Sequence, residues 1–188
     1  MPSKDKSFLK YKLGHFYDSV DKDSNGKLEM KDWLSFREKA VKNMEEDSGT
    51  KWTPEQKKRL EKAHVRSFRA LTVFGLKAKS KEKWVNYMMT VRSLPGSKAL
   101  ARRNFRSVIE AMDVNNDGVV SWKDYYLRSA SLLGLSEDEA KETFAIIDTN
   151  GNGELSIEDF TEAHLHYFRD YEYNNYANVY GQISNPEE

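Results

Sequence analysis

Apolar side chains recur every three or four residues in several segments of this chain, and short polar segments separate these runs. In the segment IEDFTEAHLHYF, Ile157, Phe160 and His164 keep this spacing, which continues to Tyr167 or Phe168. The interval is that of an amphipathic helix with one face toward a core. No segment approaches the roughly 18 consecutive apolar residues of a membrane-spanning helix. The pattern therefore predicts an all-α protein without a membrane span.

Capping residues indicate where some of these helices begin. Ser136 and Glu139 have the spacing of a capping box in front of the run AKETFAIID. The segment TPEQ at 53–56 places a proline in a first helical turn, directly after a threonine cap. Another apolar run, KEKWVNYMMTV, occupies residues 81–91. We expect a helix to begin near each of these places.

A polar segment of twelve residues occurs three times in the chain. The copies are DKDSNGKLEMKD at 21–32, DVNNDGVVSWKD at 113–124 and DTNGNGELSIED at 148–159. Each has Asp at positions 1 and 12, Asp or Asn at 3 and 5, Gly at 6 and an aliphatic residue at 8, and an aromatic residue follows. Plain turns explain one such cluster of Asp, Asn and Gly, but not three copies between helical segments.

Oxygen-rich loops of this length suit a hard divalent cation. Ca²⁺ takes six to eight oxygen ligands, which a twelve-residue loop supplies from positions 1, 3, 5, 9 and 12 and from the backbone carbonyl of position 7. Gly26, Gly118 and Gly153 stand at position 6, where the backbone turns sharply. The aliphatic residue at position 8 lies where two paired loops exchange a short strand contact. The three segments have the EF-hand loop pattern.

Candidate metal ligands follow from these positions in each loop. In the first loop they are Asp21, Asp23, Asn25, Lys27 and Asp32. In the third loop they are Asp113, Asn115, Asp117, Val119 and Asp124. In the fourth loop they are Asp148, Asn150, Asn152, Glu154 and Asp159. The residue at position 7 contributes its backbone carbonyl in each case.

The residue at position 12 sets an expectation about the ion. Ca²⁺ loops use a bidentate Glu there, whereas all three loops of this chain end in Asp, which is one methylene shorter. Fewer oxygen ligands favour the smaller Mg²⁺, so we expect Mg²⁺ to compete with Ca²⁺. The fourth loop has the fewest acids at its side-chain ligand positions, because Asn150 and Asn152 are neutral, and we expect it to bind most weakly.

A second loop is expected between the first and third, because EF hands pair. If Trp84 is the aromatic residue after this loop, the loop covers 72–83, TVFGLKAKSKEK. It has no carboxylate at positions 1, 3, 5 or 12, and lysines stand at positions 6, 8, 10 and 12. We interpret it as a degenerate hand that keeps its structural pairing with the first hand. A plain linker is the alternative, and it leaves the first hand without a partner.

Four hands with a degenerate second one, in a chain of 188 residues with an aromatic tail, resemble a known group. The group comprises the invertebrate sarcoplasmic calcium-binding proteins, the coelenterazine-binding proteins and the calcium-triggered photoproteins. The resemblance implies four EF-hand helix-loop-helix units in two pairs within one compact globular domain. The N-terminal pair covers 1–95, the C-terminal pair 96–168, and 169–188 form a tail over the core. The ending NVYGQI is similar to the luminescent branch.

The luminescent branch implies an interior cavity for a coelenterazine-like molecule. By this resemblance Tyr87, His164 and Tyr180 face the ligand, and Phe168 stands where a Trp is expected. Val91 replaces another expected Trp, which argues against light emission but leaves binding of an apolar molecule open. The alternative for His164 is a hydrogen-bonded core histidine.

Charge and composition narrow the functional classes. Residues 51–106 contain sixteen Lys or Arg and only three acids, Glu55, Glu61 and Glu82, although the whole chain has no net charge. This basic segment either balances acidic loops elsewhere in the fold or faces an anionic partner. The chain has no cysteine, which fits a reducing compartment. We expect a cytoplasmic protein that binds calcium and magnesium and no nucleic acid, and that is a monomer.

Two roles are open for such a protein. Sparse methionine and abundant aromatic residues favour a Ca²⁺/Mg²⁺ buffer that changes shape little. A calcium sensor with the basic central region as its target face is the alternative. No GxxxxGK[ST], HExxH or GxSxG motif occurs, so we do not expect an enzyme.

Overall fold

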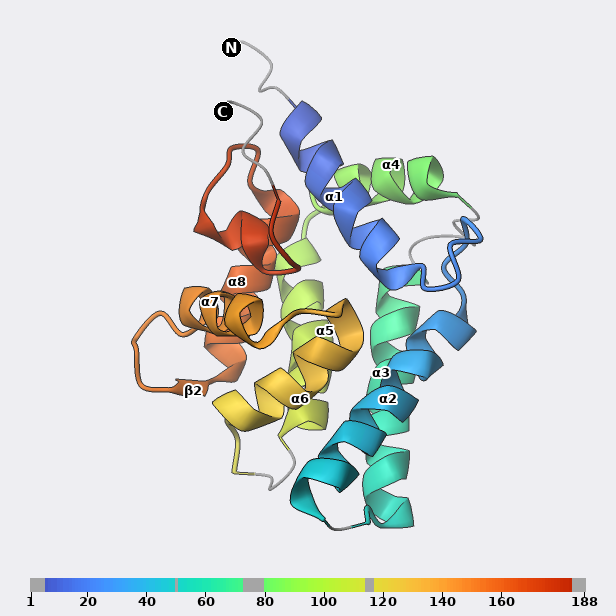
Figure 1. Ribbon diagram of the computed structural model, residues 1–188. Coiled ribbons are helices and arrows are strands. Elements are labelled where there is room, and N and C mark those ends of the chain that lie inside the picture. The colour runs from blue at the N-terminus through green and yellow to red at the C-terminus, as the bar shows by residue number, and fades with distance from the viewer. Residues whose placement is uncertain (1–5, 50, 73–79, 114–116, 184–188) are drawn as a thin grey trace.

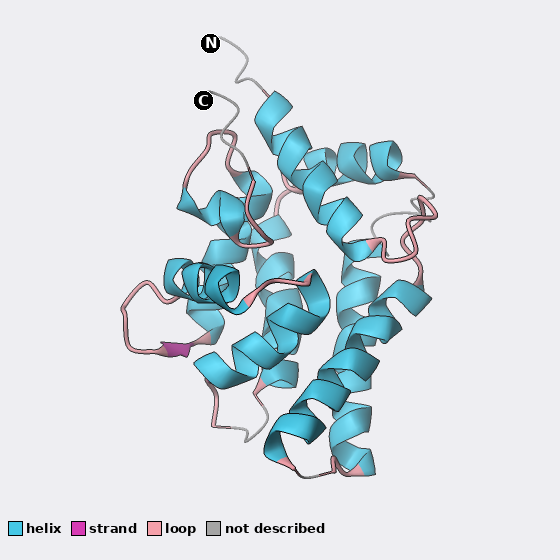
Figure 2. Cartoon of the chain, in the orientation of Figure 1, coloured by secondary structure: helices cyan, strands magenta, loops and turns pink. Residues whose placement is uncertain are grey.

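The computed structural model describes residues 6–49, 51–72, 80–113 and 117–183, in which eight α-helices account for most of the chain (Figures 1 and 2). The helices are α1 (Ser7–Val20), α2 (Met30–Ser48), α3 (Pro54–Thr72), α4 (Lys81–Val91), α5 (Ser97–Met112), α6 (Trp122–Leu133), α7 (Glu137–Ile147) and α8 (Ile157–Arg169). The described part also contains two short strands and a 3₁₀ helix, which are β1 (Val120–Ser121), β2 (Glu154–Leu155) and η1 (Asn175–Asn178). The all-α prediction is confirmed.

The expected helix starts are formed by the expected capping residues. The Ser136 hydroxyl accepts a hydrogen bond from the Glu139 amide at 3.3 Å, and the Glu139 carboxylate accepts from the Ser136 amide at 2.8 Å. At the start of α3, Gln56 and Thr53 make the same reciprocal pair, at 3.2 and 2.8 Å. These bonds satisfy amides that the first helical turn leaves without a partner.

The helices pack as two pairs of hands around one core. In the first pair α1 contacts α4 and α2 contacts α3, and in the second α5 contacts α8 and α6 contacts α7. The two pairs meet where α3 lies against α5, α2 against α6 and α1 against α8. Figure 1 shows this arrangement, with α2 and α3 running side by side along one flank. One hydrophobic cluster runs through both pairs, so the protein is a single compact domain.

The third and fourth loops are joined by the expected strand contact. Strands β1 and β2 are antiparallel, with Val120 opposite Leu155 and Ser121 opposite Glu154. Val120 and Leu155, the aliphatic residues at position 8, are both fully buried. The contact therefore anchors the two loops to the core and to each other.

The second hand keeps helices on both sides of its loop. Most of the predicted loop at 72–83, namely 73–79, lies outside the described residues. Beyond it, the Ser80 hydroxyl caps α4, and Trp84 is completely buried. The Trp84 ring stacks on Phe16 of α1 with centroids 5.6 Å apart. The aromatic position after the degenerate loop thus joins the first two hands, which supports its interpretation as a hand.

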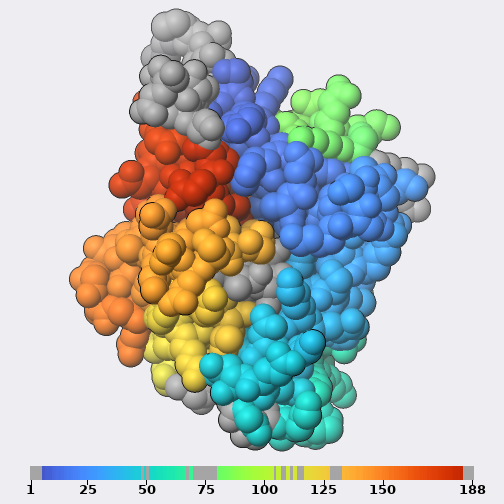
Figure 3. All heavy atoms as spheres, in the orientation of Figure 1, coloured from blue at the N-terminus to red at the C-terminus, as the bar shows by residue number. Residues whose placement is uncertain are grey.

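The tail after α8 packs over α1. Ala177 and Ile183 form a small buried cluster with Phe8, and the Tyr180 ring meets Phe16 edge-on at 4.6 Å. The space-filling view shows the tail in red directly beside the blue start of α1 (Figure 3). The expectation of an aromatic tail over the hands agrees with these contacts.

A lysine is enclosed beneath the tail. Lys12 of α1 is completely buried, and its Nζ lies 5.2 Å from the centroid of Phe8 and 5.5 Å from that of Tyr167. This Nζ has no hydrogen-bond partner within the described part of the chain. Burial lowers the pKa of Lys12 to about 8, against a smaller opposing effect of Asp170. The aromatic faces are its main compensation for lost hydration.

Some predicted features lie outside the described residues. They are the third-loop ligand candidate Asn115, residues 1–5 and residues 184–188 at the end of the tail. Within the described residues, no helix is long and apolar enough to span a membrane.

Candidate metal centres and a buried aromatic cluster

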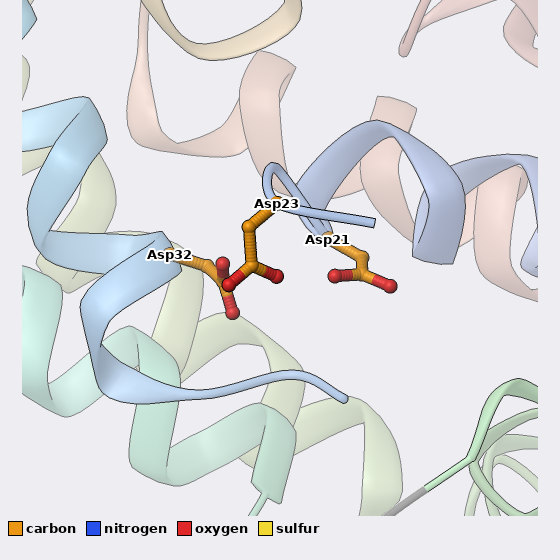
Figure 4. Close-up of side chains that lie close together, drawn as sticks. All are labelled: Asp21, Asp23 and Asp32. Atoms are coloured by element: carbon orange, nitrogen blue, oxygen red, sulfur yellow. The ribbon is translucent and has the colours of Figure 1, made fainter. Parts of the chain in front are cut away.

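The first loop brings three carboxylates together. Asp21 follows α1, Asp23 lies in the loop and Asp32 is in the first turn of α2, and one oxygen of each lies within 4.8 Å of the others. Figure 4 shows the carboxylates of Asp23 and Asp32 next to each other, with that of Asp21 at the end of α1. Asp21 and Asp32 are buried, and burial raises the pKa of Asp32. Such a cluster of acids is stabilised by a cation.

The backbone of the first loop turns its amides toward these side chains. Gly26 has φ of 76°, and its amide donates to Asp21 Oδ2 at 2.8 Å. The Asn25 amide donates to Asp23 Oδ1 at 3.2 Å, and the Lys27 amide to Asn25 Oδ1 at 2.8 Å. The side-chain oxygens at positions 1, 3 and 5 therefore share the interior of one turn.

Positions 9 and 12 have a local role that the sequence interpretation missed. They form a capping box at the start of α2, where Asp32 Oδ2 accepts from the Glu29 amide at 2.8 Å. The fourth loop repeats it, with Asp159 Oδ2 accepting from the Ser156 hydroxyl at 2.6 Å. In the third loop the Ser121 hydroxyl donates to Asp124 Oδ2 at 2.8 Å. The spacing of these residue pairs was the available signal.

A lysine at position 11 lies against the acids of the first loop. Lys31 Nζ lies 2.6 Å from Asp23 Oδ2 and 3.1 Å from Glu29 Oε2. Hydrogen bonds to this ammonium group lower the pKa of both carboxyls, and the two carboxylates raise the pKa of Lys31. The ammonium group thus neutralises part of the negative charge at this end of the loop.

The third loop repeats the geometry around its first acid. Asp113 is buried, and its Oδ1 and Oδ2 accept from the amides of Asp117 and Gly118 at 3.1 and 2.9 Å. Asp117 Oδ1 in turn accepts from the Val119 amide at 3.0 Å. Asp113 and Asp117 therefore face the same turn, to which Asp124 is joined through the capping contact of Ser121.

The fourth loop has the same backbone geometry with fewer carboxylates at its side-chain ligand positions. Asp148 Oδ2 accepts from the Gly153 amide at 2.8 Å, and Asn150 Oδ1 accepts from the Asn152 amide at 3.0 Å. The Glu154 amide donates to Asn152 Oδ1 at 2.9 Å. Asp159 closes the loop, with Oδ1 accepting from the Thr149 hydroxyl at 3.1 Å. Only two of these candidate ligands, Asp148 and Asp159, carry a carboxylate in the side chain at positions 1, 3, 5 or 12.

Three of the four residues expected at an apolar-ligand cavity lie together. The His164 ring meets Tyr180 edge-on at 5.0 Å, and Phe168 lies 5.7 Å from Tyr180. The His164 ring also stacks on Phe160 at 3.8 Å. These three residues come from α8 and the tail, and they pack against one another as parts of the core.

His164 has the environment of a core histidine. It is 3% exposed, and its Nδ1 lies 2.6 Å from the Phe160 carbonyl oxygen, to which it donates. Burial lowers the pKa of His164 to about 3, although this hydrogen bond opposes the shift. The ring is therefore neutral, with its Nδ1 proton committed to α8.

Tyr87 lies apart from these three residues. It belongs to α4, and no ring contact joins it to His164, Phe168 or Tyr180 within the described residues. Its hydroxyl is buried and has no hydrogen-bond partner there, as is also true of the Trp84 Nε1 atom. Burial raises the pKa of Tyr87 to about 12. Two polar atoms on neighbouring turns of α4 thus lack the partners that buried groups usually have.

The third and fourth loops with their flanking helices have the EF-hand arrangement, and comparison with known families agrees for this part of the chain. Residues 105–125 and 140–163 match the family model described as EF hand. These segments contain the third and fourth loops, so the pattern recognised from the sequence is confirmed there. Calerythrin from Saccharopolyspora erythraea is 43% identical over 51 residues, which are 27% of this chain and 28% of calerythrin. This match spans less than a third of either protein.

Solved structures share the fold over nearly the whole chain. The coelenterazine-binding protein from Renilla muelleri, in its calcium-loaded apo form, has a TM-score of 0.80 at 19% identity, covering 97% of this chain and all of that one. The sarcoplasmic calcium-binding protein from amphioxus has a TM-score of 0.63 at 15% identity, covering 94% and 98% of the two chains. At these identities the similarity establishes a common fold.

Proposed function

We propose that the protein binds Ca²⁺, with Mg²⁺ competing, and acts as a calcium buffer through its first, third and fourth loops. The observation that carries the proposal is the meeting of Asp21, Asp23 and Asp32 within 4.8 Å. Three acids with additional amide and carbonyl oxygens match the donor set of a hard cation. The similarity to a calcium-loaded protein and to a sarcoplasmic calcium-binding protein supports the choice of ion.

The three loops differ in the charge that they offer to the ion. The first loop has a cluster of three acids and the fourth has the fewest carboxylates at its side-chain ligand positions, so affinity decreases from the first to the fourth. The ligands we propose are those at positions 1, 3, 5, 7 and 12 of each loop, including Asn115 outside the described residues. The degenerate second hand takes no ion and supports the first hand through Trp84.

A buffer role fits the way the methionines are placed. Met44 and Met112 are buried, while Met88 and Met89 pack against the core. A sensor instead exposes a methionine-rich groove when calcium binds. Binding of a hydrophobic-surface dye only in the presence of Ca²⁺ would contradict the buffer role and favour a sensor. A monomeric state, a cytoplasmic location and the division into pairs at 1–95 and 96–168 stay predictions.

The proposal is tested by calorimetric titration of the metal-free protein with Ca²⁺, first without Mg²⁺ and then with an excess of Mg²⁺. We expect three sites that weaken in Mg²⁺. Asp21→Asn with Asp32→Asn removes one site, whereas the control Asp18→Asn, an exposed acid on α1 outside the loop, removes none. Absence of saturable Ca²⁺ binding overturns the proposal.

A second candidate function is the binding of an apolar small molecule of the coelenterazine type. The specific observation in its favour is the pair of buried polar atoms without partners on α4, the Tyr87 hydroxyl and Trp84 Nε1. A ligand with polar groups at its edges supplies the missing hydrogen bonds. The similarity to a coelenterazine-binding protein supports this candidate. Titration with coelenterazine tests it by tryptophan fluorescence, and an unchanged spectrum contradicts it.

A further inference from the structure

A cavity lies between α5 and α8, beside the end of the fourth loop. These helices pack against each other, and a cavity of about 320 Å³ opens between them toward solvent. Its lining residues are Arg102, Arg103, Arg106, Ile157, Glu158 and Thr161. Pockets that hold small molecules have volumes of about 300–1,000 Å³, so this cavity is at the small end of that range.

The cavity is lined mainly by positive charge. Its three arginines come from consecutive turns of α5, whereas Glu158 is its one acidic lining residue. Arg102 Nη2 lies 2.5 Å from Glu158 Oε1 and 2.8 Å from Glu162 Oε1. These two contacts hold the Arg102 guanidinium between α5 and α8, at the edge of the cavity. Three guanidinium groups thus stand beside two carboxylates, Glu158 and Glu162, so positive charges outnumber negative charges at the cavity.

Two features of α8 add to the positive potential. Ile157 is the first residue of this thirteen-residue helix, so the cavity borders the positive end of its dipole. Thr161 is 0% exposed, and its hydroxyl has no hydrogen-bond partner within the described residues. A buried hydroxyl without a partner can donate a hydrogen bond to a ligand that enters the cavity.

We propose that this cavity binds the phosphate group of a small phosphate monoester. A guanidinium fork matches two phosphate oxygens at once, and the arginines here outnumber the carboxylates beside them. The volume admits a phosphate with a small substituent. Neither the arginines nor Thr161 is a candidate metal ligand, although Ile157 and Glu158 of the lining belong to the fourth loop. The site also assigns a local role to part of the basic segment.

The proposal is tested on the full chain without metal by following backbone amide signals by NMR. Glycerol phosphate is added at constant ionic strength, with chloride as the matched anion. We expect saturable shifts at 102–106 and 157–161, with roughly tenfold weaker binding in the double variant Arg102→Gln and Arg106→Gln. The matched control is Lys58→Gln with Lys62→Gln, which removes the same charge from exposed positions on α3.

A second variant changes the binding in the opposite direction. Glu158→Gln with Glu162→Gln releases Arg102 from its two carboxylates and strengthens phosphate binding. Damage to the fold would weaken binding, so a gain in affinity cannot result from such damage. Vesicles of phosphatidylcholine with phosphatidylinositol phosphate distinguish a lipid headgroup from a free monoester as the source of the phosphate. Binding to either source that depends on the arginines supports the site. Shifts that chloride reproduces, or equal losses in the arginine and lysine variants, overturn it.

Discussion

Lys31 Nζ lies 2.6 Å from Asp23 Oδ2, so the first loop carries a cation of its own. The two residues stand at positions 11 and 3 of the same twelve-residue segment. Lys31 also contacts Glu29 at position 9, at 3.1 Å. A divalent ion that uses Asp23 must take this carboxylate from the ammonium group. The first loop therefore contains an internal competitor for its own acidic ligands.

We predict that Lys31→Gln strengthens Ca²⁺ binding at the first loop about two- to fivefold. The gain is small because the exposed ion pair that no longer has to be broken is weak. Calorimetric titration measures the change. The binding step of the first loop is identified because it disappears in Asp21→Asn. The control Lys27→Gln removes the same charge without this ion pair. Equal gains in both variants would show that only the net charge of the loop matters.

We predict that a longer acid at position 12 favours Ca²⁺. Asp32→Glu, Asp124→Glu and Asp159→Glu each add the methylene that a bidentate ligand needs, and each tightens Ca²⁺ binding at its own loop by about tenfold, or about 1.4 kcal/mol. The selectivity of each loop for Ca²⁺ over Mg²⁺ rises together with its Ca²⁺ affinity. The control Asp138→Glu makes the same change on the exposed face of α7. If affinity falls or stays constant in all three loops, the explanation by side-chain reach is wrong.

The buried Lys12 makes stability depend on pH in a defined direction. Its folded-state pKa of about 8 lies below the ordinary lysine value of 10.5, so the unfolded chain holds the proton more tightly. The contribution of Lys12 to the free energy of unfolding therefore rises between these two values as pH increases, and the cost of burying its charge is fully present below them.

We predict that Lys12→Met stabilises the protein at neutral pH by about 1–2 kcal/mol, after allowance for solvent screening. The advantage over the wild type shrinks as pH rises from about 8 toward 10.5. Urea unfolding of both proteins at several pH values measures it. Lys10→Met on the exposed face of α1 is the control and shows no such trend. A constant difference between the two proteins across this range contradicts the assignment.

The unpartnered hydroxyl of Tyr87 gives a prediction for the protein without ligand. Tyr87→Phe removes a buried polar atom that has no hydrogen bond, and it raises the free energy of unfolding by about 1 kcal/mol. Thermal unfolding with and without coelenterazine measures the effect. The exposed Tyr11→Phe leaves stability unchanged. A loss of stability in ligand-free Tyr87→Phe would mean that the hydroxyl has a partner.

The sequence predicted those parts of the molecule that depend on local spacing. The loops, the caps of α3 and α7, the strand contact at Val120 and the core position of Trp84 each follow from residues close together in the chain. The capping role of Asp32 and Asp159 also follows from residues close together in the chain, but these two residues were interpreted only as metal ligands. A residue can cap a helix and remain a candidate ligand.

Contacts between distant segments were not predictable in the same way. Lys12 is polar in a helix whose apolar face is broad, and its burial depends on Tyr167 from α8. The arginines of α5 form a cavity only because Ile157 and Thr161 of α8 lie opposite them. Periodicity shows that a face is buried but does not identify the helix that covers it. The packing of α5 against α8 supplies that information.

The cluster of Phe8, Ala177 and Ile183 has a consequence for synthesis of the chain. The ribosome releases α1 before Ala177 and Ile183, the residues that cover Phe8. During translation this face of α1 is exposed to solvent and to other proteins, because its partners do not yet exist. This small cluster therefore forms only after residue 183 has left the ribosome, and its formation joins α1 to the segment that follows α8.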